Sequence, residues 1–379
     1  MRKNPDISTL TSDAVELLKE MIAIPSPSFE EDAVCSHICR WLSSKSIAHR
    51  RVGNNIIAEH IYDESRPTLM LCAHIDTVSP SPEYSFDPYR PDYQTAGKVI
   101  SEVLGEDIGP EEIVAGLGAN DDGASVVAMI GVFRYFYSTI YGNRGVGCPN
   151  LMLVLSCEEE RSGRNGMTGL WSELASKVDF AIVGEPTGMK AATAERGLLV
   201  IDARASGVSG HAARNEGKNA LYIALEDIDK LRKHLFDRVS PRMGKVNLNV
   251  TQISAGSAHN VIPDRCDFVI DIRPTEQYRN EEILSELQAI CESELKARNL
   301  SNRSSATFED SPLQKAAEKS GIETFSSPTT SDWMRISCDA VKMGPGDSSR
   351  SHRKNEFVFV EEIRNGIETY IKFINNIMM

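Results

Sequence analysis

The sequence has no long apolar run. No stretch of its 379 residues approaches the roughly 18 consecutive apolar residues that a membrane span requires. The first six residues, Met1 to Asp6, lack the apolar core of a signal peptide. These two absences predict a protein without a membrane partner.

Cysteine and net positive charge are also scarce. Eight cysteines in a chain of this length are too few for a disulfide scaffold, and none has zinc-finger spacing. This usage predicts a reducing, cytoplasmic location. The formal net charge of −13 cannot neutralise a phosphate backbone, so no nucleic-acid partner is expected. Part of the acidic excess could be a carboxylate cluster whose charge a bound cation cancels.

Short apolar runs that end abruptly in polar residues alternate with helical patterns in both outer parts of the chain. Such runs are typical of buried strands in a mostly parallel α/β sheet. Helical spacing covers Leu10 to Ile24 and Glu31 to Ser46. The predicted strands are Thr68–Ala73, Asn150–Ser156, Asp179–Val183 and Ala340–Met343.

The middle of the chain follows a different pattern. The order strand, helix, strand, strand, helix, strand predicts a ferredoxin-like (β-α-β-β-α-β) domain. We therefore expect a catalytic domain at 1–189 and 311–379, with a second domain at 190–310 inserted into it. The predicted elements are Leu198–Ala205, Lys218–Arg238, Val246–Ser254, Cys266–Arg273, Glu281–Arg298 and a strand near Ala306–Phe308.

Histidines and carboxylates follow the predicted buried strands. The carboxyl ends of strands line the ligand crevice of open α/β sheets, so these side chains should converge. Each alone has a simpler explanation: a bonded surface histidine, a solvated acidic face, or a turn at Asp121-Asp122-Gly123. Together they would repel one another without a cation, and imidazole with carboxylate suits zinc, cobalt or manganese better than calcium. The residues are His74, Asp76, Glu158, Glu159, Glu160, Glu185 and His352.

An ordered set of motifs resembles the acetylornithine deacetylase/succinyl-diaminopimelate desuccinylase family of dinuclear zinc amidohydrolases and peptidases. No single motif is specific, but the order is, and the match runs from about residue 10 to the end of the chain. The motifs are His74-x-Asp76, Gly116-x-Gly118-Ala119-x-Asp121, Glu158-Glu159-Glu160, Gly184-Glu185-Pro186-Thr187 and Ser209-Gly210-His211-Ala212.

The resemblance implies roles for individual residues. Two divalent metal ions, zinc or otherwise cobalt or manganese, would be bound by His74, Asp121, Glu160, Glu185 and His352, with Asp121 bridging them. Asp76 would fix the His74 ring, and Glu159 would act as the general base. His211 would hold the oxyanion across the interface of a homodimer formed by the inserted domain. Asn260, Arg273 and Thr330 resemble residues that bind substrate.

One motif departs from the family. Family members commonly have Met-Lys-Gly after the bridging aspartate, whereas Asp122-Gly123 follows directly here. The loss of a lysine charge beside the metals puts local electrostatics and substrate choice in doubt. It leaves the ligand set complete.

The resemblance implies hydrolysis of an N-acyl amino acid, with N-acetylornithine, a substrate of arginine biosynthesis, as the first choice. Acetyl-citrulline, acetyl-lysine, succinyl-ornithine and succinyl-diaminopimelate are alternatives. A dizinc aminopeptidase or dipeptidase is the nearest rival, because His-x-Asp and Gly-Ala-x-Asp-Asp also occur in that related group. A catalytically inactive binding module would not need the intact Glu159 and ligand set.

Overall fold

A computed structural model describes residues 5–138, 149–214 and 216–377. The first four residues of the N-terminal segment that lacks the apolar core of a signal peptide, Met1 to Asn4, lie outside the described residues. The chain forms two compact units. The larger unit contains residues 1–193, 307–325 and 331–379, and the smaller contains 194–306 and 326–330. No described helix has the length and apolar character that would let it span a bilayer.

The larger unit contains most of a mixed sheet with nine strands among the described residues; Ser305–Ala306 and the ends of two further strands are residues of the smaller unit. Its four central strands, β5, β3, β6 and β16, pair in parallel, while the strands toward the edges pair antiparallel. This confirms the predicted α/β fold with a mostly parallel central sheet. The strands are β1 Arg50–Val52, β2 Asn55–His60, β5 Asn150–Ser156, β3 Thr68–His74, β6 Phe180–Val183, β16 Asp339–Lys342, β7 Ala191–Glu195, β14 Ser305–Ala306 and β15 Thr324–Ser327.

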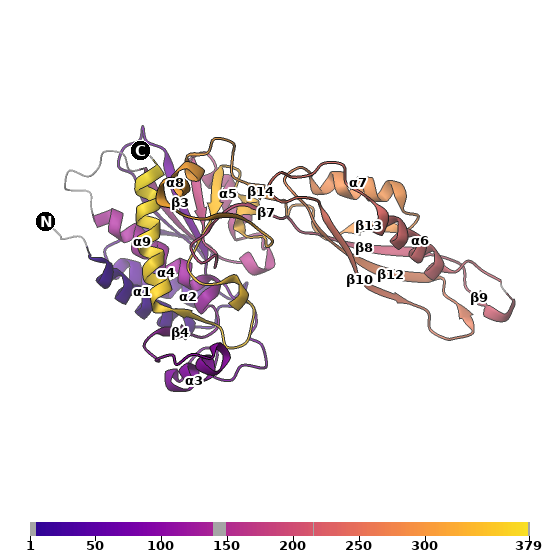
Figure 1. Ribbon diagram of the computed structural model, residues 1–379, viewed down its shortest axis with the longest axis horizontal. Helices are drawn as coiled ribbons and strands as arrows, with labels where there is room; N and C mark the ends of the chain where they lie inside the picture. Colours follow the sequence, from indigo (N-terminus) through magenta and orange to yellow (C-terminus); the bar gives the residue numbers. More distant parts are fainter. Residues whose placement is uncertain (1–4, 139–148, 215, 378–379) are drawn as a thin grey trace. The chain divides into compact units, whose positions relative to one another are not determined.

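Helices cover both faces of this sheet, because residues on alternate sides of each central strand are apolar. In β3, Leu69 and Leu71 join the core beneath α1, α2, α4, α8 and α9, while Met70 and Cys72 join the core beneath α5. Figure 1 shows α1 and α9, the first and last helices, side by side. The helices are α1 Ile7–Ile22, α2 Asp32–Ser44, α3 Tyr93–Leu104, α4 Ala124–Ser138, α5 Met167–Leu174, α8 Pro312–Ser320 and α9 Val360–Ile377. A separate strand pair joins β4 Ile113–Ala115 to β17 Phe357–Phe359.

The smaller unit has a four-stranded antiparallel sheet in the order β10-β12-β8-β13. Buried and exposed residues alternate along β8, and its buried face packs with α6 and α7 (Figure 1). A short pair, β9 with β11, lies outside this sheet. The elements are β8 Leu199–Ser206, β9 Gly210–His211, α6 Ala220–Lys233, β10 Asn247–Ala255, β11 Val261–Ile262, β12 Arg265–Arg273, α7 Asn280–Ile290 and β13 Glu294–Ala297.

The predicted last helix and last strand of the ferredoxin-like pattern are wrong in position. Helix α7 ends at Ile290, and Cys291 already has an extended backbone. Residues Glu294–Ala297 form β13, in which Leu295 pairs with Ala203 of β8. Residue Ala306 belongs instead to β14, which pairs with β7. Leu295 and Ala297 alternate with charged neighbours, but two apolar residues are too few to outweigh the helical pattern that precedes them.

Candidate metal centre

The ends of the central strands bring the predicted metal ligands together in the larger unit. His74 is the last residue of β3, Glu160 lies in the turn after β5, and Glu185 follows β6 by two residues. His74, Asp121 and Glu160 each offer a ligand atom within 4.8 Å of the others. His352 joins them, since its Nε2 lies 2.9 Å from Glu160 Oε1.

Asp121 occupies the middle of this cluster. Its Oδ1 lies 3.2 Å from His74 Nε2, and its Oδ2 lies 3.5 Å from His352 Nε2. The two oxygens of one carboxylate thus face two different histidines. Asp121 is in a tight turn after Gly118, and its peptide bond to Asp122 is cis. The position of the Asp121 carboxylate between the two histidines fits a ligand shared by two cations.

Charge in the site is unbalanced in favour of carboxylates. Burial and the nearby Asp121 charge raise the pKa of Glu185 well above its ordinary value. Burial also raises the pKa of Glu159, with added repulsion from Asp332 and Glu160. The hydrogen bond to Glu160 raises the pKa of His352 to about 9. These side chains fit divalent cations, which would allow the carboxylates to ionise together.

Asp76 connects the two sides of the site. Its backbone carbonyl oxygen lies 3.0 Å from His74 Nδ1, which fixes the ring so that Nε2 points to Asp121. Its carboxylate accepts the backbone N–H groups of Glu159 and Glu160 at 3.0 and 3.1 Å. His74 Nδ1 also lies 3.5 Å from Asp76 Oδ1. Although burial opposes ionisation, this side-chain interaction with His74 keeps the pKa of Asp76 below its usual range.

Glu158, the first of the three consecutive glutamates, uses its carboxylate within its own turn. Its carboxylate accepts hydrogen bonds from the side chain and the backbone N–H of Asn165, at 2.7 and 3.0 Å. Its side chain is buried, and its own backbone is in the left-handed region, with φ of 59°. Because its acceptors are used within the turn, the geometry favours Glu159 over Glu158 as the base.

Two buried carboxylates of the site carry no motif and were missed as site residues. Glu356 accepts the backbone N–H groups of Gly118, Asn120 and Asp121 and so holds the Asp121 turn. Burial raises its pKa to about 8. Asp332 is buried and accepts a hydrogen bond from the Ser156 hydroxyl at 2.6 Å. In the sequence, the only signal for Glu356 is its position four residues after His352 and directly before an apolar strand.

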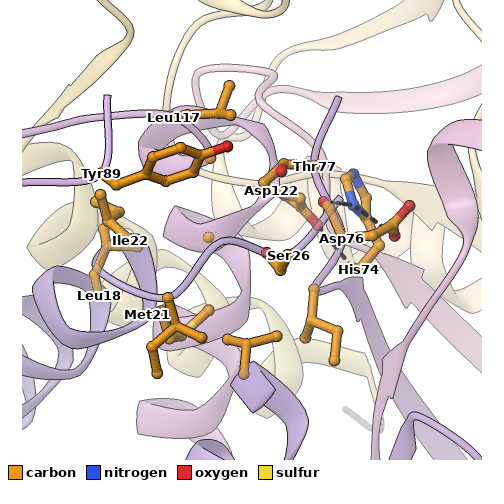
Figure 2. Close-up of a pocket in the computed structure, with 15 residues that line it drawn as sticks. Leu18, Met21, Ile22, Ser26, His74, Asp76, Thr77, Tyr89, Leu117 and Asp122 are labelled. Carbon is orange, nitrogen blue, oxygen red and sulfur yellow. Dashed lines mark hydrogen bonds and ion pairs between the residues drawn. The ribbon is translucent and has the colours of Figure 1, made fainter. Parts of the chain in front are cut away.

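The pocket in Figure 2 borders the metal ligands but is too small for a substrate. His74, Asp76 and Asp122 line it together with apolar side chains of α1, such as Leu18 and Ile22. It encloses about 20 Å³, which is room for a single water molecule. A molecule larger than water does not fit in this pocket.

The remaining predicted residues lie in the smaller unit. His211 in β9 and Asn260 are exposed neighbours, since the backbone N–H of Ala212 donates to the Asn260 carbonyl. Arg273 is at the other end of β12, where it pairs with Asp271 at 2.8 Å. Thr330 is half-buried in the short 326–330 segment. The structure thus brings His211 and Asn260 together and keeps Arg273 apart from them.

Comparison with known proteins gives matches along most of the chain. Residues 193–299 match the peptidase dimerisation domain family, and residues 55–181 match peptidase family M28. Succinyl-diaminopimelate desuccinylase of Wolbachia pipientis subsp. Culex pipiens is 24% identical, with 96% of this chain and 93% of the relative covered. Acetylornithine deacetylase of Proteus mirabilis is 25% identical, with 92% and 94% covered.

Among solved structures, aminopeptidase PepT from Bacillus cereus superposes with a TM-score of 0.74 at 16% identity, covering 97% of this chain and 99% of that one. This similarity establishes the shared fold. Together with the two relatives and the dimerisation domain, it confirms the resemblance carried by the motifs. The chain is a hydrolase that is similar in sequence to acetylornithine deacetylase and succinyl-diaminopimelate desuccinylase, and its larger unit contains a candidate site for divalent metal.

Proposed function

We propose that this protein hydrolyses the amide bond of an N-acyl amino acid, with N-acetylornithine as substrate and ornithine and acetate as products. The observation that carries the proposal is the central Asp121 carboxylate, whose two oxygens face His74 and His352. A ligand set of this kind supports a two-metal hydrolytic centre. The relatives named acetylornithine deacetylase support the choice of substrate.

Two zinc ions are the proposed cofactors, and the mixed imidazole and carboxylate ligands support that choice. His74, Asp121, Glu160, Glu185 and His352 would hold them. Bound there, the ions supply Lewis acidity that activates water and polarises the amide carbonyl.

Glu159 is the proposed general base. Its carboxylate takes a proton from the attacking water and passes it to the amide nitrogen, which then leaves as an amine. A base must remain free of other partners and be held in place. The two N–H groups that Asp76 accepts, from Glu159 and Glu160, fix the backbone at this point. The raised pKa of Glu159 supports a proton-transfer role.

The smaller unit is proposed to form a homodimer and to supply substrate contacts. The match of residues 193–299 to a peptidase dimerisation domain supports this assembly. His211 would hold the developing oxyanion of the neighbouring subunit's substrate. Asn260, Arg273 and Thr330 are proposed substrate contacts. The free thiols of the described cysteines support a reducing cytoplasm as the compartment.

Cleavage of a peptide with a free amino terminus is the second candidate. Asp122-Gly123 replaces the family's usual Met-Lys-Gly, and residues 55–181 match peptidase family M28. Buried Asp122, whose pKa burial raises to about 8, places acid rather than base beside Asp121. Without the family's lysine at this position, no cation there would repel the ammonium group of a free amino terminus.

A substrate panel tests the proposal and separates the two candidates. Purified, zinc-loaded protein is assayed with N-acetyl and N-succinyl derivatives of ornithine, citrulline, lysine and diaminopimelate, and with free-amine dipeptides. Highest kcat/KM for N-acetylornithine is expected. A preference for another acyl amino acid would change the substrate while keeping the reaction. Turnover confined to the dipeptides would replace the proposal with the aminopeptidase alternative.

A further inference from the structure

Three consecutive backbone N–H groups at the turn after β5 each donate to a carboxylate from elsewhere in the chain. The Glu159 and Glu160 groups donate to Asp76, as described above. The Glu158 group donates to Glu31 Oε1 at 3.1 Å. Asp76 follows a metal ligand by two residues. Glu31 lies between α1 and α2, far from any of the family motifs.

Glu31 is fully buried, and its carboxylate accepts three hydrogen bonds that link this region together. Its Oε1 also accepts the Phe29 N–H at 2.8 Å, and its Oε2 accepts the Asn54 side-chain amide at 3.0 Å. Although Glu31 occupies the N-cap position of α2, its side chain makes no capping hydrogen bond. Capping of α2 therefore does not explain a carboxylate here. Burying a carboxylate costs free energy unless the group is hydrogen-bonded. The position of the Glu31 carboxylate next to the Glu158 N–H therefore requires another explanation.

The turn that Glu31 holds needs external support. Glu158 and Ser162, on either side of the short 3-10 helix Glu159–Arg161, have φ values of 59° and 48°. Non-glycine residues rarely adopt this left-handed region, so neighbouring contacts must maintain it. Without a fixed Glu158, the backbone that precedes Glu159 could relax and carry the carboxylate of Glu159 away from its place.

The loop that contains Glu31 also supports the other carboxylate. Ser28 Oγ donates to Asp76 Oδ2 at 2.7 Å, and the Thr77 N–H donates to the Ser26 carbonyl at 2.9 Å. Segment 26–31 thus contains one acceptor of the three N–H groups, Glu31, and supports the other, Asp76. We propose that Glu31 is a positioning residue that sets the Glu159 carboxylate through the Glu158 N–H. This inference rests on the proposed role of Glu159 as the base.

The first test compares Glu31→Ala with Glu31→Gln, using Glu30→Ala as the matched control, since Glu30 is an exposed neighbour on the same loop. Glu31→Ala should lower kcat by about tenfold or more, because small displacements of a catalytic group are costly. KM and metal content should stay within about twofold of wild type. Glu31→Gln should recover part of the rate, because its amide oxygen can still accept from Phe29 and Glu158. Glu30→Ala should match wild type.

A double-mutant cycle decides whether the effect passes through Glu159. In the Glu159→Gln background, Glu31→Ala should cause no further loss of kcat beyond about twofold, because the group that it positions is gone. An undiminished loss in that background would overturn the proposal, as would wild-type kcat for Glu31→Ala. If Glu31→Ala does not fold, Glu31→Gln, which loses the acceptor for Asn54, enters the same cycle.

Failure of the underlying function gives a different result. If Glu159→Gln alone keeps wild-type turnover, the base is assigned wrongly, and both proposals fall. If Glu159→Gln is impaired while Glu31 variants are normal, only the positioning role of Glu31 is refuted.

Discussion

The two units differ in the surroundings of their carboxyl groups. In the smaller unit, surface carboxylates pair with arginines: Arg204 and Arg265 flank Asp267, and Arg298 binds Asp202. These hydrogen bonds lower the pKa of both aspartates. In the larger unit, burial raises the pKa of Asp122 and Glu356 to about 8 and of Asp332 to about 6. The smaller unit pairs these carboxylates with its own arginines, whereas the larger unit gathers buried carboxyl groups that a bound cation would allow to ionise.

The largest effect should come from removing a ligand in the larger unit. His74→Ala or Asp121→Ala should lower turnover by at least about 10²-fold, a loss that even residues supporting metal ligands can cause. Elemental analysis should find fewer than the expected two ions per chain. Active wild-type protein that contains no transition metal would contradict the metal centre and remove the contrast between the units.

Replacing the base should separate metal binding from chemistry. Glu159→Gln keeps the shape of the side chain and removes its ability to take a proton, so the rate should fall by about 10² or more. Metal content should be unchanged. A variant with wild-type turnover would show that the proton acceptor is another group.

Mixing two inactive variants tests whether His211 of the smaller unit completes the site of a neighbouring subunit. Glu159→Gln subunits are re-equilibrated with His211→Ala subunits. Half of the dimers should be mixed, and each should have one site with both intact residues, which restores about a quarter of wild-type activity. Mixtures that stay inactive after exchange would refute the contribution in trans. Each variant re-equilibrated with itself is the control.

The stability of metal-free protein should depend on pH in the direction set by the larger unit. The pKa of Glu356 is about 8 in the fold against an ordinary 4.5, so the folded form retains a proton that the unfolded chain releases. Its contribution is therefore complete below about pH 4.5 and is lost as pH rises through 8. His352, with a pKa raised to about 9, acts in the same direction.

Urea unfolding of chelator-treated protein should give a free energy at least about 2 kcal/mol lower at pH 8 than at pH 6, which is the contribution of Glu356 alone. Saturating zinc should reduce this difference, because bound cations favour the ionised carboxylates. Metal-free stability that rises over this range would contradict the raised pKa values of the buried acids.

The smallest effect should come from a charge pair in the smaller unit. Asp267→Asn removes the partner of two exposed arginines, and exposed pairs contribute about 0.2–1 kcal/mol. Metal content and turnover should be unchanged. A loss of bound metal in this variant would show that the two units are coupled through charge.

Local patterns in the sequence predicted the four central strands of the larger sheet because buried parallel strands are short apolar runs with sharp ends. Residues Asn150–Ser156 are β5 with the same bounds. In the smaller unit, the segment Glu294–Ala297 has only two apolar residues, and its pairing with β8 decides its conformation. That pairing joins residues about ninety positions apart, which no local pattern contains.

The site was predictable where a motif marks the end of a strand, as at His74 and Glu185. Glu31, Asp332 and Glu356 were not, because their importance comes from backbone N–H or hydroxyl groups that only the folded chain brings to them. A buried carboxylate and an exposed one look alike in a single sequence. Burial therefore had to be observed before these residues could be assigned.

The order of strands in the larger sheet has a consequence for the synthesis of the protein. Strand β16 lies between β6 and β7 but follows them in the chain by more than a hundred residues, after the whole of the smaller unit. His352 and Glu356 come later still. A growing chain that has just finished the smaller unit already carries His74, Asp121, Glu160 and Glu185, yet lacks the strand that joins the two halves of the sheet. The full set of proposed metal ligands is therefore present only after His352 has been synthesised.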